Sequence, residues 1–136
     1  MKNVSLIDSG PIIALFNKKD RYHKKCLNFF KSYKGSLISS CSVVTEVIYL
    51  LSFSITAQMN FLEWIERGGL TIHELSADDL DYIKKRMKKY SDLPMDFANA
   101  SLMSFSEKFS IDAIISIDSD FSIYRKLDGK FLKNLL

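Results

Sequence analysis

The sequence contains few of the residues from which disulfide frameworks and zinc sites are built. Its 136 residues include only 2 cysteines and 2 histidines. Cys26 and Cys41 form no Cys-x-x-Cys or Cys/His spacing, which argues against a disulfide framework and predicts two buried thiols in a reducing cytosol. His23 and His73 are too few and too far apart in the sequence to indicate a zinc site.

Long hydrophobic runs and linker-like segments are missing as well. The apolar run at residues 4–7 ends at Asp8, so it is too short for a signal-peptide core, and no stretch is long enough to span a membrane. We therefore expect a cytoplasmic protein without membrane association. With 2 prolines and 5 glycines the chain has no linker rich in these residues and no repeat, and we expect a single domain over residues 1–136.

Neither sign of charge dominates the chain. Its 19 basic and 16 acidic residues leave a net charge of +3, which permits a nucleic-acid partner without requiring one. Hydrophobic residues make up 47% of the chain, so it has enough apolar material for a core, and its composition is not that of a disordered protein.

Short apolar runs alternate with amphipathic stretches along the chain. The predicted strands span residues 4–7, 36–39, 70–74, 113–117 and 131–136. The predicted helices are one with Pro11 in its first turn, 22–33, 43–51, a segment around 61–65 that stops at Gly68, 80–90 and, after Pro94, 98–109. Their apolar stripes include Leu50 and Leu80, which we expect to face the core. The alternation predicts an α/β fold of three layers, with helices on both faces of a central, mostly parallel, twisted sheet.

Two of the apolar runs end in an aspartate. Asp8 follows VSLI, and Asp118 follows IISI. Because ligands of parallel sheets bind at the carboxyl ends of the strands, two central strands would bring these carboxylates to the same edge. Either aspartate alone is explained by capping of the next element, since aspartate is common at such turns. Two aspartates after two fully apolar runs favour a functional site.

Glu46 interrupts an apolar helical stretch, three residues after Val43 and four before Leu50, on or beside the inward-facing stripe. A capping box does not explain it, because position 43 is neither serine nor threonine. A carboxylate near the core is costly unless a cation or donors satisfy it, although extension to the helix edge would also relieve that cost. Asp96 and Asn99 share a face at the start of a later helix, where Asp96 alone would serve as a cap.

These acids carry the functional hypothesis. They are Asp8, Glu46, Asp96 and Asp118. No histidine stands beside them, and no Ser-His or Cys-His pair competes with them. Carboxylates of this kind favour a hard cation such as Mg²⁺ or Mn²⁺. Such an ion activates a water molecule and stabilises the leaving oxygen of a phosphodiester, so the pattern indicates metal-dependent phosphodiester hydrolysis.

At these residues the sequence resembles the PIN-domain family, and within it the VapC-like toxin ribonucleases of type II toxin–antitoxin systems. The resemblance covers essentially the whole chain. Four segments are similar in order to the acidic motifs of that family: VSLIDSGPIIALF, VVTEVIYLL, YSDLPMDFANASLMSFSEKF and IISIDSDF. Any one of these segments is a weak signal, whereas four in the right order at the right spacing are specific.

The resemblance implies a metal-dependent endoribonuclease that acts on RNA, pairs with a small antitoxin protein and forms a homodimer. The implied catalytic acids are Asp8, Glu46, Asp96 and Asp118. The implied ligands of Mg²⁺ or Mn²⁺ are Asp8, Asp96, Asn99 and Asp118. The residues expected to support these ligands are Ser9, Ser116 and Asp120.

One segment departs from the family pattern. Relatives commonly have Asp-x-x-Asp-Ala where this chain has Asp96, Phe97, Ala98, Asn99 and Ala100. The usual third acid then corresponds to Asn99, with Asp96 one turn earlier on the same face. An amide oxygen can ligate a metal but brings no charge. The departure therefore leaves open a catalytically weakened PIN domain that binds RNA or a protein without cutting.

Two other phosphotransfer folds fit poorly. A receiver domain would need a cluster of acids after the first strand and a phosphoacceptor aspartate at the end of a strand in mid-chain. A haloacid-dehalogenase phosphatase would need a second aspartate two residues after Asp8, and that position is Gly10.

The basic residues fall into two groups. The first follows the opening helix and is a candidate to flank an RNA entrance: Lys18, Lys19, Arg21, Lys24 and Lys25. The second is expected to form the solvated face of a helix: Lys84, Lys85, Arg86, Lys88 and Lys89.

Overall fold

The computed structural model describes residues 3–93 and 95–136, and its centre is a parallel sheet. The sheet has five strands in the order β3-β2-β1-β4-β5, and every neighbouring pair is parallel. The strands are β1 (Val4–Ile7), β2 (Ser36–Ser40), β3 (Thr71–His73), β4 (Ala113–Ile115) and β5 (Lys133–Asn134). The register places Leu6 of β1 between Ile38 of β2 and Ile114 of β4. The predicted α/β class with a parallel sheet is confirmed.

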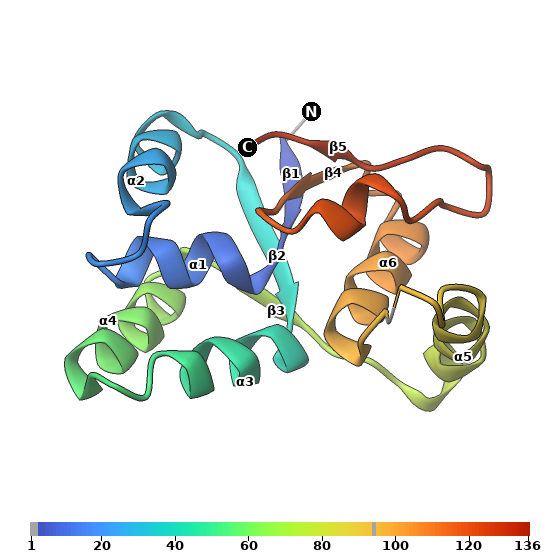
Figure 1. Ribbon diagram of the computed structural model, residues 1–136, viewed down its shortest axis with the longest axis horizontal. Helices are drawn as coiled ribbons and strands as arrows, with labels where there is room; N and C mark the ends of the chain where they lie inside the picture. The colour runs from blue at the N-terminus through green and yellow to red at the C-terminus, as the bar shows by residue number, and fades with distance from the viewer. Residues whose placement is uncertain (1–2, 94) are drawn as a thin grey trace.

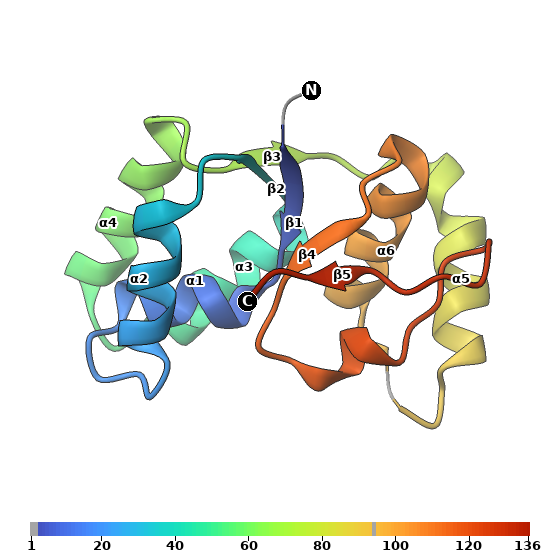
Figure 2. The same cartoon turned by 90° about the horizontal axis from the view of Figure 1, so that it is seen from above.

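Helices lie on both sides of this sheet. The α-helices are α1 (Ser9–Phe16), α2 (His23–Ser32), α3 (Cys41–Leu50), α4 (Ile55–Glu66), α5 (Leu80–Lys89) and α6 (Phe97–Phe109). The 3-10 turns are η1 (Ala77–Asp79) and η2 (Ser119–Ser122). Figures 1 and 2 show α1, α2 and α4 on one side of the strands and α5 and α6 on the other. Helix α3 contacts both α1 and α6, so it joins the two sides at one end of the sheet.

The central strands are buried on both faces, which explains their mainly apolar pattern, and the one polar residue of β1, Ser5, accepts from the Tyr33 hydroxyl at 2.7 Å. Leu6 and Ile7 of β1 and Ile114 and Ile115 of β4 have no exposed surface, and they belong to one cluster of buried hydrophobic residues. Within the described residues, no helix combines the length and the apolar character needed to cross a lipid bilayer.

Two helices begin directly at the carboxyl ends of the central strands. Helix α1 starts at Ser9, right after β1, with Asp8 as its N-cap and Pro11 in its first turn. Helix α3 starts at Cys41, two residues earlier than the apolar pattern predicted, because the Ser40 hydroxyl accepts a hydrogen bond from the Val43 amide and caps it. Pro94, expected just before the last helix, lies outside the described residues.

The last two strands are shorter than the apolar runs in the sequence predicted. Strand β4 ends at Ile115 rather than at residue 117, because the Ser116 hydroxyl accepts from the Asp118 amide and turns the chain away from the sheet. The strand predicted at 131–136 is reduced to Lys133–Asn134.

Four side chains lie where the sequence did not place them. Leu50 and Leu80, expected in the core, are 47% and 42% exposed, because each stands at an end of its helix, beyond the packed part of the stripe. The Cys41 thiol, expected to be buried, is exposed at the first turn of α3. Arg86, expected on a solvated face, is buried.

Buried Arg86 ties helix α5 to the chain that follows η2. Its Nη1 donates to the Arg125 carbonyl oxygen at 3.0 Å, and its guanidinium lies 5.3 Å from the centre of the Tyr82 ring. The Arg125 amide in turn donates to the Tyr90 hydroxyl at 2.9 Å. Helix α5 therefore holds the segment that continues from Asp118 and η2.

This contact predicts a stability difference between two neighbouring basic residues. Arg86→Ala leaves the Arg125 carbonyl without its donor and removes buried packing, so it should lower the free energy of unfolding by about 2–3 kcal/mol. Lys85→Ala removes only an exposed ion pair with Asp81 and should cost less than about 0.5 kcal/mol. Urea unfolding of both variants measures the difference, and equal losses would contradict the role given to Arg86.

Candidate active site

Asp8 and Asp118 lie at the same edge of the sheet, as the sequence predicted. Asp8 follows β1 directly, and its amide donates to the carbonyl oxygen of Ile115, the last residue of the neighbouring β4, at 3.1 Å. Asp118 follows β4 after a two-residue turn. Because β1 and β4 are adjacent and parallel, both carboxylates stand at their carboxyl ends.

The Asp8 carboxylate is buried, with 6% of the residue exposed. Its Oδ1 accepts from the Ser9 amide at 2.8 Å, and its Oδ2 accepts from the Ser116 hydroxyl at 3.3 Å. Burial is the main cause that raises the pKa of Asp8 to about 7; the Ser9 amide lowers this pKa, the nearby carboxylates of Glu46 and Asp118 raise it, and the Ser116 hydroxyl lowers it.

Glu46 is half-buried on α3 and reaches the site through a serine. Its Oε1 accepts from the Ser9 hydroxyl at 2.6 Å, so the residue after Asp8 holds this carboxylate beside it. The Ser9 hydroxyl is thus a donor that satisfies the Glu46 carboxylate, which is one of the two alternatives that its position in the sequence left open.

The turn after β4 is organised around Ser116 and Asp118. The Ser116 hydroxyl donates to Asp8 and accepts from the Asp118 amide at 3.0 Å, so one side chain links the two aspartates. Asp118 Oδ1 accepts from the Asp120 amide at 2.9 Å and caps η2. Burial raises the pKa of Asp120, and the carboxylates of Asp118 and then Asp96 add to that increase.

Asp96 and Asn99 approach the same edge from the start of α6. Asp96 is exposed and caps the helix, with Oδ1 accepting from the Asn99 amide at 2.8 Å. Asn99 is buried, and its Nδ2 donates to the Tyr124 hydroxyl at 3.4 Å. Burial raises the pKa of Tyr124, and the charges of Asp120, Asp118 and Asp96 contribute. Sequence reasoning missed Tyr124, because an aromatic residue six positions after Asp118 carries no metal-ligand signal.

The acids therefore gather along one edge in two groups that share Asp118. One group joins Asp118 to Asp8 and Glu46, and the other joins it to Asp120 and Asp96. Within residues 3–93 and 95–136, no three of the Asp, Glu, His and Cys side chains come close enough together to hold a metal ion.

The chemistry of these side chains nevertheless suits a hard cation. After burial, the largest influences on the Asp8 pKa are two further carboxylates, Glu46 and Asp118, and two neutral donors, the Ser9 amide and the Ser116 hydroxyl. A buried carboxylate opposed by its neighbours in this way is a costly arrangement that a divalent cation would relieve. Oxygen ligands are those that Mg²⁺ and Mn²⁺ prefer.

Two members of the first basic group stand apart from these acids. Lys18 and Lys19 follow the end of α1, and the eight residues of that helix place them about 12 Å along its axis from Asp8. Arg21 packs its guanidinium 4.9 Å from the centre of the Tyr22 ring.

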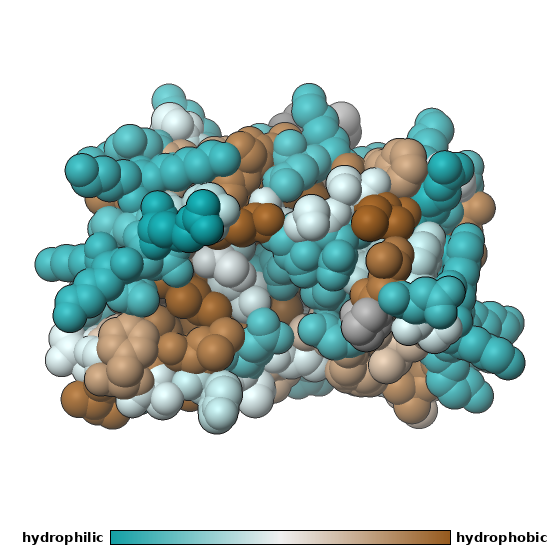
Figure 3. Space-filling model, viewed as in Figure 1, coloured by the Kyte–Doolittle hydropathy of each residue, from teal (hydrophilic) through white to brown (hydrophobic). Residues whose placement is uncertain are grey.

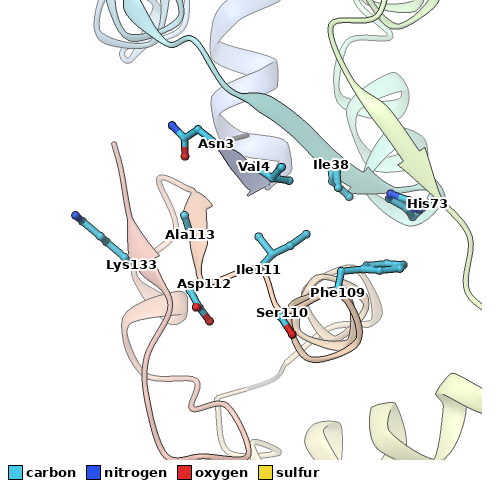
Figure 4. A pocket seen from close by; sticks show the side chains of 10 residues that line it. All are labelled: Asn3, Val4, Ile38, His73, Phe109, Ser110, Ile111, Asp112, Ala113 and Lys133. Carbon is cyan, nitrogen blue, oxygen red and sulfur yellow. The ribbon is translucent and has the colours of Figure 1, made fainter. Parts of the chain in front are cut away.

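A cavity of about 500 Å³ lies at the other edge, where β1, β4 and β5 begin. Figure 4 shows Val4, Ala113 and Lys133 at those strand starts, with His73 and Phe109 at the far end of the cavity. The cavity runs from these strand starts past Ile38 to His73 at the end of β3, and neither Asp8 nor Asp118 lines it.

Comparisons with known proteins agree with the motifs. No family model matches the chain. In sequence it is similar to ribonuclease VapC26 of Mycobacterium tuberculosis, with 22% identity over 127 residues, covering 91% of this chain and 94% of that protein. In structure it is similar to Mycobacterium tuberculosis VapC20, a toxin that cleaves the sarcin–ricin loop, with a TM-score of 0.78, 18% identity and coverage of 88% and 93%.

A second solved structure with this fold is VapBC2 from Rickettsia felis, bound to a DNA fragment from its promoter. The TM-score is 0.63 and the identity 16%, over 96% of this chain and 98% of that one. The resemblance to VapC-like proteins that the four acidic segments predicted is thus confirmed in sequence and in fold.

The raised pKa of Asp8 predicts how stability depends on pH without metal. Between the ordinary value of 3.8 and about 7 the folded protein binds a proton that the unfolded chain has lost, so stability should fall as pH rises through that range and level off above it. The total change is on the order of 4 kcal/mol. Urea unfolding in EDTA measures it.

Asp8→Asn is the matched variant, because its neutral side chain cannot titrate. It should lack the fall that Asp8 causes in this range and be more stable than the wild type above about pH 7. Stability of the wild type that rises between these pH values would contradict the burial of an uncompensated Asp8 carboxylate.

Proposed function

We propose that this protein is an endoribonuclease that hydrolyses RNA phosphodiester bonds and is the toxin of a toxin–antitoxin pair, acting as a single domain in the cytoplasm where its RNA is found. The observation that carries the proposal is the buried Asp8 carboxylate beside Glu46 and Asp118 at the carboxyl edge of the sheet. Its support is the similarity to a ribonuclease in sequence and to a toxin in fold.

We propose Mg²⁺ or Mn²⁺ as the cofactor, with Asp8, Asp96, Asn99 and Asp118 as its ligands. When bound, such an ion would lower the pKa of a water molecule and offset the negative charge of the phosphodiester. Ser116 positions two of these ligands: its hydroxyl donates to Asp8 and fixes the turn that carries Asp118. Asn99 is oriented by its hydrogen bond to Tyr124, which leaves the amide oxygen as the atom that faces a ligand.

Glu46 is the carboxylate that we place outside the ligand set, as the general base. Its Oε1 is held by the Ser9 hydroxyl, so Oε2 is the atom that takes the proton from the attacking water. The water oxygen bonds to phosphorus, the bond to the leaving ribose oxygen breaks, and that oxygen takes a proton from solvent. Asp120 adds negative charge beside Asp118 and Asp96 without a direct role in this step.

A second candidate is a weakened domain that binds RNA or a protein without cutting it. It is favoured by the neutral Asn99 and by the lack, within the described residues, of three metal-binding side chains that come close together. Cleavage of RNA by the wild type with Mg²⁺ or Mn²⁺ separates the two candidates. Cleavage that appears only in Asn99→Asp would favour the weakened domain.

The central prediction is that Asp8→Asn abolishes RNA cleavage without unfolding the protein. The variant loses a charged ligand, while the removal of carboxylate repulsion keeps the metal-free fold intact. Cleavage of end-labelled RNA is measured with Mg²⁺ or Mn²⁺, with EDTA as the blank. The matched control is Asp81→Asn, which alters an exposed acid on α5. Cleavage that resists EDTA, or unaltered cleavage by Asp8→Asn, would show that this edge is not the catalyst.

We also propose two protein partners. A small antitoxin is supported by the similarity to VapBC2. A homodimer is supported by apolar side chains exposed on α3, α4 and the turn between them, where Figure 3 shows brown surface at the lower left. These residues are Tyr49, Leu50, Phe53, Ile55, Met59 and Leu62.

Light scattering tests the homodimer. The wild type should have the mass of two chains, and Phe53→Glu should shift it towards one, because a charge within an apolar interface is costly. Leu127→Glu, at another residue that is 70% exposed, should leave the mass unchanged. Only monomer at high concentration of the wild type would refute the pairing.

A further inference from the structure

A second cavity of about 500 Å³ lies at the same edge of the sheet as the acids. Its walls come from the first turn of α3, the segment that follows β3 and the first residues of α5 and α6. Because β2 and β3 end here and β1 is the next strand, the cavity lies beside the acids along the edge. It is in the size range of pockets that hold small molecules.

The first turn of α6 separates this cavity from the acids. Asp96 acts electrostatically on Asp120 and Tyr124, whereas Phe97, the next residue, lines the cavity. The two α-carbons are about 3.8 Å apart. Below them the Ser101 hydroxyl donates to the Ser40 hydroxyl at 2.7 Å and fixes α6 against the start of α3. A chain bound at the acids therefore reaches the cavity by crossing a single turn of helix.

The lining of the cavity suits a flat, uncharged group. Phe97 and Leu80 are 43% and 42% exposed, so both offer apolar surface there. Ser42, His73 and Glu74 add polar atoms that can donate or accept hydrogen bonds. None of the residues that line it is lysine or arginine, so the cavity does not have the chemistry of a phosphate site.

We propose that this cavity is a subsite for one unpaired nucleobase of the RNA, stacked on Phe97, next to the phosphate that is cleaved. The inference rests on the proposed ribonuclease function and adds a substrate class, since only an unstacked base in a single strand or loop can enter. The cavity of Figure 4 shares His73 with this one, but its residues Val4, Ala113 and Lys133 stand at the strand starts, away from Asp8 and Asp118.

The test is a double-mutant cycle between the protein and the RNA. The probe is a short, fluorescein-labelled, single-stranded RNA that the wild type cleaves at one position, with abasic nucleotides placed singly along it. Binding is measured by fluorescence anisotropy with Ca²⁺ in place of Mg²⁺, so that a divalent cation is present at the acids, and gel analysis checks that the RNA stays intact during the measurement. The variants are Phe97→Ala, Phe97→Tyr as the conservative exchange, and Leu127→Ala as an exposed control away from the cavity.

Phe97→Ala should weaken binding of the intact RNA about tenfold, and Phe97→Tyr should restore it, because stacking needs only an aromatic face. Leu127→Ala should change nothing. In the wild type, removing the base beside the cleaved phosphate should weaken RNA binding by a similar factor. In Phe97→Ala the same abasic RNA should bind no more weakly than the intact RNA does. Equal melting temperatures of the variants confirm that folding is unaffected.

Other outcomes overturn the subsite. If Phe97→Ala leaves the RNA affinity unchanged, no base stacks on Phe97. The same conclusion follows if the losses of affinity caused by Phe97→Ala and by the abasic nucleotide are additive at every position. If Phe97→Ala changes the mass of the protein in light scattering but leaves its RNA affinity unchanged, the cavity belongs to a protein interface. Cleavage that depends on Asp8 but not on Phe97 refutes the subsite alone, whereas a wild type that cleaves no RNA refutes the proposed function itself.

Discussion

The burial of the Asp8 carboxylate at the end of the central strand is the constraint on which the site depends. β1 is the middle strand of the parallel sheet, and Asp8, the residue that follows it, bonds through its amide to Ile115 of β4 and caps the helix that starts at this edge. Two neighbouring carboxylates face it, and the donors that reach it are a backbone amide and a hydroxyl. The metal-free fold therefore carries an electrostatic cost at the centre of its candidate active site.

Serine side chains connect the elements around this carboxylate. Ser9 holds Glu46 of α3, Ser116 holds Asp8 and the turn that carries Asp118, and Ser40 binds Ser101 of α6. A serine hydroxyl can both donate and accept, and Ser116 does both: it bridges the Asp8 carboxylate to the Asp118 amide without adding charge. The acids are thus positioned by neutral groups, which leaves their negative charge available to a cation.

The sequence allowed the sheet and part of the site to be predicted, and the limits have physical causes. The mainly apolar runs at β1 and β4 reflect burial on both faces, and burial is what a local pattern encodes, so Asp8 and Asp118 could be placed at one edge. The partner of Glu46 is a serine 37 residues away, and Arg86 bonds to a carbonyl 39 residues away. Such partners depend on tertiary packing and leave no periodic signal. The exposure of Leu50 and Leu80 was missed for the same reason, since periodicity does not show where packing stops.

The distribution of charge at this edge of the sheet determines which contacts could hold RNA there. On one side of the first turn of α6, the main groups that act on Asp8 are two carboxylates and two neutral donors. On the other side, no lysine or arginine lines the cavity. Lys18 and Lys19 stand about a helix length away, and Arg86 is committed to Arg125. Proteins that hold nucleic acid mainly through lysine and arginine lose affinity steeply with salt, because binding releases counterions. At this edge a cation between carboxylates and phosphate, together with a stacked base, would carry the contact. An edge of this kind would neutralise few phosphates, so the affinity of RNA held here should fall less steeply with salt than on a surface with many lysine and arginine contacts.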